Sequence, residues 1–122
     1  MNRYHVKTGF DISHIDILKK LSIELNAKKW QYSNHCLDNL KYRIIDIKAL
    51  LLFIKNIKLN YESLFEYYSE GNNIIKVCYR IPFNMDMDII LILSHDKNII
   101  TIYLNTSGDN HITLKTELYN KI

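Results

Sequence analysis

The chain has 122 residues, of which 48% are hydrophobic, and it contains three Gly and one Pro. This length and composition indicate a single ordered domain over residues 1–122 and argue against a disordered segment. The net charge of +3, from sixteen Lys and Arg against thirteen Asp and Glu, permits contact with a polyanion but does not require it.

The N-terminal residues MNRYHVKTGFD lack the apolar stretch of a secretory signal. The most apolar run, ALLLFI, is bounded by Lys48 and Lys55 and is far shorter than the roughly 18 residues of a membrane-spanning helix. We therefore expect no membrane span. We also expect a cytoplasmic location, which the domain reaches by itself or as the delivered part of a larger effector.

Three amphipathic helices are predicted in the first half of the chain. Asp11 is a suitable N-cap for a helix that ends near Asn26, and its apolar stripe is Ile12, Ile15, Leu18, Leu21 and Leu25. Ser33 can cap a second helix, with an apolar side formed by Cys36, Leu37, Leu40 and Ile44. Asp46 can cap a third, whose apolar face is Ile47, Leu50, Leu51, Ile54 and Ile57.

A change of period from 3.6 to 2 follows the Gly-Asn-Asn turn signal at 71–73. Three strands are predicted, roughly Ile74 to Ile81, Asp88 to Ser94 and Ile99 to Asn105. Their short links require antiparallel pairing, because a parallel crossover needs a dozen or more residues. The fold class is therefore predicted to be α+β, with N-terminal helices packed on a C-terminal antiparallel β-sheet.

The matching periodicities predict one core between helices and sheet. Its expected members are Ile12, Ile15, Leu18, Leu21, Leu50, Leu51, Ile54, Val77, Leu91, Ile102 and Leu104. The two cysteines, Cys36 and Cys78, fall in apolar-periodic segments, and a disulfide-built scaffold of this size would carry more of them. We expect both to be reduced core or near-core thiols.

Polar residues alternate with apolar ones in two of the predicted strands. Lys76 and Arg80 share one face of the first strand, and the last strand groups Thr101, Tyr103 and Asn105. If these sets share a face, the loop after the last strand adds Asp109, Asn110 and His111 at its rim. Arg and Lys bind phosphate oxygens and the hydroxyls can hydrogen-bond the same group, so this pattern favours a phosphodiester site.

A histidine, or a pair of them, can move protons to and from a ribose 2′-hydroxyl and a leaving oxygen near neutral pH. The sequence has no Cys-x-x-Cys, no His-x-x-x-His and no carboxylate cluster at ligand spacing, so we expect neither a metal nor a cofactor. Simpler interpretations stay open: alternating cations are often a solvated sheet face, and Thr and Tyr are good strand formers. His5, His14 and His95 receive no functional role.

The order of these elements resembles the compact ribonuclease toxins of the barnase/EndoU/colicin/RelE (BECR) group, and in particular their RelE-like and DUF4258-like members. The resemblance spans about residues 30–114. Its motifs are YSNHCLDNLKYR with His35 and Arg43, the basic strand KVCYRI, the strand IITIYLN and the loop GDNH. It implies a RelE/barnase-like fold and metal-independent RNA cleavage. Carried over by position, the implied catalytic residues are His35, His111, Lys76, Arg80, Thr101 and Tyr103, and the implied substrate-binding residues are Arg43, Asn105 and Asn110.

Two hypotheses of different class follow. The first is an endoribonuclease toxin that cleaves RNA, with tRNA as one candidate, by 2′-hydroxyl attack on the phosphodiester. Its partners would be the RNA substrate and a cognate antitoxin or immunity protein. The alternative is a non-catalytic nucleic-acid- or protein-binding partner, such as an antitoxin-like, immunity-like or phage-encoded interaction domain. Growth arrest on expression is expected only from the first.

Overall fold

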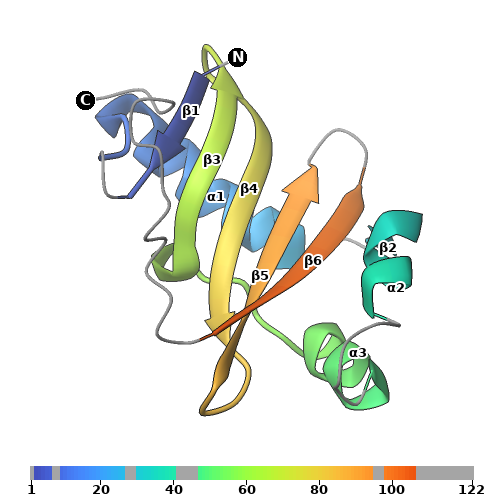
Figure 1. Cartoon of the computed structure of the whole chain (residues 1–122). Helices are drawn as coiled ribbons and strands as arrows, with labels where there is room; N and C mark the ends of the chain where they lie inside the picture. The colour runs from blue at the N-terminus through green and yellow to red at the C-terminus, as the bar shows by residue number, and fades with distance from the viewer. Residues whose placement is uncertain (1, 7–8, 27–29, 41–46, 95–97, 107–122) are drawn as a thin grey trace.

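The computed structural model describes residues 2–6, 9–26, 30–40, 47–94 and 98–106. This part of the chain is an α+β domain with three α-helices and one six-stranded sheet (Figure 1). The elements in chain order are β1 (Asn2–His5), α1 (Ile12–Asn26), β2 (Gln31–Tyr32), α2 (Asn34–Leu40), α3 (Ile47–Lys55), a 3-10 turn η1 (Tyr61–Ser63), β3 (Leu64–Glu70), β4 (Asn73–Pro82), β5 (Met87–Ser94) and β6 (Ile99–Thr106).

The sheet order is β1-β3-β4-β5-β6-β2. All neighbours are antiparallel except β2, which pairs with β6 in parallel. The three predicted strands are confirmed as β4, β5 and β6. The expectation that helices come first and the sheet second was wrong, because β1 precedes α1 and β2 lies between α1 and α2.

The missed strands carry weak local signals. β1 and β2 have four and two residues, which is too few for a two-residue period to stand out. The alternation of β3 is interrupted by register shifts between Leu64 and Glu66 and between Tyr68 and Ser69. A β-bulge of this kind changes which residues face the core and hides the period in the sequence.

Helix α1 begins and ends as predicted. The Asp11 carboxylate accepts hydrogen bonds from the Ser13 backbone N–H at 2.9 Å and from the Ser13 hydroxyl at 2.8 Å, and these bonds lower the pKa of Asp11. The predicted core position of Ile12 was wrong, since its side chain is 80% exposed. The buried stripe runs from His14 through Leu18 to Leu25, and Ile12 lies two residues before His14, about 200° away around the helix.

Helices α2 and α3 follow the predicted pattern in part. The Ser33 hydroxyl accepts a hydrogen bond from the Cys36 backbone N–H at 3.0 Å, which confirms the predicted cap of α2. Cys36 is fully buried, whereas Leu37 is 38% exposed. Leu50 and Ile54 of α3 are buried, as predicted. Two predicted residues lie outside the described part of the chain: Ile44, expected on the apolar side of α2, and Asp46, expected to cap α3.

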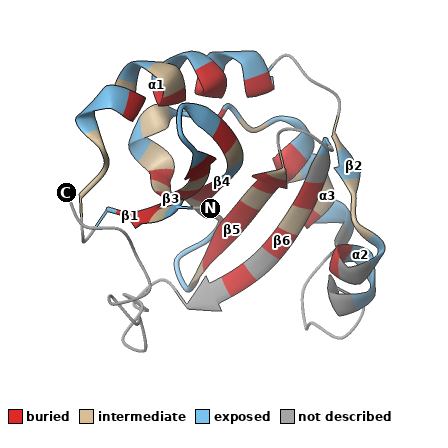
Figure 2. Cartoon of the chain, turned by 90° about the horizontal axis from the view of Figure 1, so that it is seen from above, coloured by how far each residue is buried: buried red, intermediate tan, exposed pale blue. Residues whose placement is uncertain are grey.

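The core lies on the face of the sheet that α1 covers, and the strand register builds it in cross-strand rows. One row joins Tyr4, Tyr67, Val77, Leu93 and Ile100 across five strands. Figure 2 shows the buried positions running along most of β5. The predicted members that are buried are Leu18, Leu21, Leu50, Ile54, Val77, Leu91, Ile102 and Leu104, while Ile15 and Leu51 are half-buried. Cys36 and Cys78 are free, buried thiols, as predicted.

Candidate functional site

The two faces of the sheet differ in chemistry. We call the face in contact with α1 the core face and the opposite one the outer face. Strand alternation puts Lys76 and Arg80 of β4 on the outer face, and the register through β5 puts Thr101 of β6 there as well. Lys76 and Arg80 share a face, as the strand alternation predicted, and the condition that Thr101 lies on the same face is met. Their roles in binding or catalysis stay predictions.

The two cations of β4 have different surroundings. The Arg80 guanidinium pairs with Asp88 of β5, with Nε at 2.7 Å from Oδ2, and both side chains are mostly buried. Lys76 is exposed, and its ammonium lies 5.8 Å from the centre of the Tyr68 ring. Among the described residues no carboxylate forms an ion pair with Lys76. Lys76 is therefore the better placed of the two to meet an external anion.

Thr101 lies two strands away from these cations. Its backbone is opposite Ile92, which in turn is opposite Cys78, so about 10 Å of sheet separates β6 from β4. The side chains of β5 between them on the outer face are Ile90 and Ile92. Tyr103 and Asn105 occupy the strand positions opposite Ile90 and Asp88, and their side chains lie outside the description.

The remaining predicted residues are placed only partly or not at all. His35 belongs to α2, which packs beside β6 (Figure 1), but its side chain is not described. Arg43, Asn110 and His111 lie outside the described residues. The described part of the chain therefore brings Lys76, Arg80 and Thr101 to one face, and the places of the His35 and His111 side chains relative to that face stay predictions.

Sequence reasoning missed a row of residues at the other side of the outer face. Arg3, Tyr68 and Lys76 are cross-strand neighbours on β1, β3 and β4. The Arg3 guanidinium lies 5.2 Å from the centre of the Tyr68 ring, so two cations approach one aromatic ring. Arg3 also forms an ion pair with Glu66. Only the pairing of β1 with β3 reveals this row, and β1 is too short to be predicted.

The next row along the outer face is largely buried. This row consists of cross-strand neighbours on five strands, which are in order His5, Glu66, Cys78, Ile92 and Thr101. Within it, His5 and Cys78 are almost fully buried. Burial, followed by the charge of Glu66, raises the pKa of the Cys78 thiol. A thiol of this kind stays protonated at neutral pH and is a poor nucleophile. Cys78 is therefore a packing residue.

His14, to which the sequence assigned no role, is part of a buried hydrogen-bond network on the core face. Its Nε2 lies 2.8 Å from the carbonyl oxygen of Gly71, and its Nδ1 lies 2.7 Å from the Tyr67 hydroxyl. A carbonyl can only accept, so Nε2 donates to Gly71, and in the neutral imidazole Nδ1 then accepts from the Tyr67 hydroxyl. The Asp11 backbone N–H donates to the same hydroxyl at 3.3 Å. This network ties α1 to the β3–β4 hairpin and has a structural role.

No described helix is long and apolar enough to cross a membrane. Within the described ranges, His, Cys, Asp and Glu form no group of three or more that could hold a metal ion. No family model, characterised protein or solved structure matches the chain. A functional proposal therefore depends on the residues of the site and on the motifs of the sequence.

Proposed function

We propose that the chain is a metal-independent endoribonuclease of the compact toxin type and that RNA binds across its outer face. The observation that carries the proposal is the shared face of Lys76, Arg80 and Thr101, extended by the Arg3–Tyr68–Lys76 row. Lys and Arg meet phosphate oxygens, and an aromatic ring on a sheet can stack on an unpaired base. A cationic surface with an aromatic residue suits single-stranded RNA.

The narrower structural proposal is a RelE/barnase-like fold. An α+β domain with a helix on one face of a mostly antiparallel sheet supports it. In this arrangement the helix-covered face supplies most of the core, and the substrate would meet the outer face where it is accessible, at exposed Lys76 and half-buried Tyr68 and Thr101. A cognate antitoxin or immunity protein would inhibit the enzyme by covering the outer face, and tRNA is one candidate substrate.

The proposed reaction is a transesterification at phosphorus. A general base removes the proton of the ribose 2′-hydroxyl, and its oxygen attacks the adjacent phosphorus. The bond to the 5′-oxygen breaks, and that oxygen takes a proton from a general acid, which leaves a 2′,3′-cyclic phosphate and a 5′-hydroxyl. His35 and His111 are proposed for the two proton transfers. Lys76 and Arg80 stabilise the charge on the phosphate, with Thr101 and Tyr103 as hydroxyl donors.

The test of this proposal is cleavage by histidine variants with a chelator present throughout. His35→Ala and His111→Ala should each lower the cleavage rate, since loss of one general acid or base costs about 10²- to 10⁴-fold. Growth arrest on expression should be lost in the same variants. Melting temperatures close to the parent's would show that the variants are folded, so that the loss of cleavage comes from the missing proton transfer and not from unfolding. Cleavage by both variants at the parent's rate would contradict the catalytic proposal.

A second candidate is a non-catalytic binding partner, and one observation favours it. The guanidinium groups of Arg3 and Arg80 already pair with Glu66 and Asp88, and apolar Ile90 and Ile92 separate the cations of β4 from Thr101. Such a face can bind a polyanion through Lys76 without assembling a catalytic group. RNA binding without cleavage and without growth arrest would replace the first proposal with this one.

A further inference from the structure

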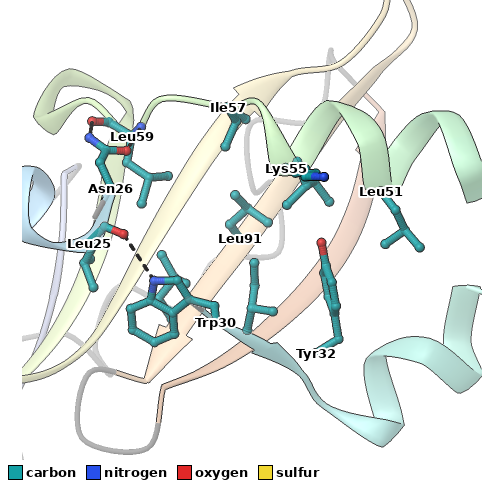
Figure 3. A pocket seen from close by; sticks show the side chains of 12 residues that line it. Leu25, Asn26, Trp30, Tyr32, Leu51, Lys55, Ile57, Leu59 and Leu91 are labelled. Atoms are coloured by element: carbon teal, nitrogen blue, oxygen red, sulfur yellow. Dashed lines mark hydrogen bonds between the residues drawn. The ribbon is translucent and has the colours of Figure 1, made fainter. Parts of the chain in front are cut away.

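A cavity of about 590 Å³ lies on the core face, away from the proposed RNA surface. The sheet contributes Leu91, Leu93 and Ile100 to its lining. Leu91 is labelled in Figure 3. Its walls come from the end of α1, from β2 and from α3. Cavities of this size with mostly apolar walls are typical of small-molecule sites.

Two hydrogen-bonded contacts hold the walls of the cavity in place. The Asn26 side chain accepts from the Leu59 backbone N–H at 2.6 Å and donates to the Leu59 carbonyl at 2.9 Å. The Trp30 indole N–H donates to the Leu25 carbonyl at 3.2 Å, as drawn in Figure 3. These bonds join the end of α1 to the segments on both sides of the cavity. The polar atoms of Asn26 and Trp30 are thus used within the protein, and their apolar surfaces remain for a ligand.

The other polar side chains of the wall are Tyr32 and Lys55. Lys55 is exposed at the end of α3, and it is the one charged side chain among the described residues of the lining. In Figure 3 the Tyr32 hydroxyl points toward the side of the cavity from which Lys55 projects. Burial raises the pKa of Tyr32, so its hydroxyl is a neutral hydrogen-bond donor at physiological pH.

We propose that this cavity binds a small carboxylic acid with an apolar body. The Leu and Ile side chains of the sheet and the Trp30 ring contact the body, and the carboxylate lies at the Lys55 side of the cavity. A carboxylate has two acceptor oxygens, which match one ammonium and one phenol donor. A phosphate dianion would leave one charge without a cation at this position. The inference is independent of the proposed nuclease function, because it uses the opposite face of the sheet.

Trp30 is the single tryptophan of the chain, so its fluorescence reports directly on occupancy of the cavity. The probes are sodium decanoate and 1-decanol, which share an apolar chain and differ in charge. A saturable change in Trp30 fluorescence is expected with both, and decanoate should bind more tightly. Lys55→Met should weaken decanoate binding about three- to tenfold, the range of a partly exposed charged contact, and should leave decanol binding unchanged.

The matched control is Lys48→Met, which removes a lysine from the same helix but outside the lining. It should leave the affinity for decanoate at the parent's value. Absence of a saturable change in Trp30 fluorescence would overturn the proposal, as would equal affinities of decanoate for the parent and Lys55→Met. Self-association of the chain, seen by sedimentation and abolished by filling the cavity with Leu51→Trp, would assign the cavity to a second copy and would also overturn it.

Discussion

Tyr79 shows how a single polar atom is accommodated in the core. Its side chain is fully buried, and its hydroxyl lies 2.7 Å from the Ser22 hydroxyl of α1. Burial raises the pKa of Tyr79 to about 12, and the hydrogen bond between its hydroxyl and that of Ser22 limits this rise. The neutral phenol is therefore the form that the folded state requires, because an ionised one would be a buried charge.

This pKa gives a prediction for stability at alkaline pH. The folded-state pKa of Tyr79 lies above its ordinary value of 10, so the stabilisation is complete below pH 10 and is lost as the pH rises toward 12. The loss should be on the order of 2 kcal/mol. The free energy of unfolding from urea titrations should fall less steeply over this range in Tyr79→Phe than in the parent.

Ser22→Ala serves as the control for this titration, because it keeps the buried phenol and should keep the alkaline decline. Its overall stability should be lower at every pH, since the Tyr79 hydroxyl loses its partner. An equally steep decline in Tyr79→Phe and in the parent would show that other groups determine the alkaline transition.

At the scale of an element, the β3–β4 hairpin depends on one backbone conformation. Gly71 and Asn72 connect Glu70 to Asn73, which are paired across the two strands, and Gly71 has a φ of +58°. The Gly71 carbonyl also accepts the hydrogen bond from His14 of α1. The turn therefore positions both the strand that carries Lys76 and the contact that holds the start of α1.

Gly71→Ala should destabilise the fold by about 1 kcal/mol, because a side chain in this left-handed region is strained. A Cβ at this position would meet no atom within 4 Å, so the cost comes from the backbone alone. Gly71→Asn should cost less, since Asn tolerates the conformation. Urea unfolding measures both, and Asn72→Ala is the control for the neighbouring turn position. Equal stability of Gly71→Ala and the parent would contradict this account.

The elements also show where sequence reasoning succeeds. Asp11 and Ser33 were predicted as caps because a cap acts within three residues of its own position. The alternation in β4 is regular enough to predict that Lys76 and Arg80 share a face of that strand. Thr101 joins this face only through the register of β4 and β6 with β5, which the sequence left open. Arg3 and Tyr68 were missed because they meet only through the pairing of β1 with β3, about sixty residues apart in the chain.

At the scale of the whole molecule, the sheet separates the two proposed binding sites. Its core face packs against α1 and leaves a cavity toward α3, while its outer face carries Lys76, Arg80 and Thr101. Arg80 is partly buried with Asp88, so its removal leaves a buried carboxylate and disturbs the fold as well as any binding. Lys76 is exposed and can be replaced without this effect. It is the residue at which an effect on the proposed RNA binding is best separated from an effect on stability.

The most direct test of the proposed RNA surface is the salt dependence of binding to a single-stranded RNA. Lys76→Ala is compared with Lys20→Ala, which removes an exposed lysine of α1 and so changes the net charge equally. Loss of one phosphate contact should lower the slope of log affinity against log salt by about 0.7 in Lys76→Ala, with weaker binding at low salt. Lys20→Ala should keep the slope of the parent. Identical slopes for the two variants would contradict the assignment of the outer face to RNA.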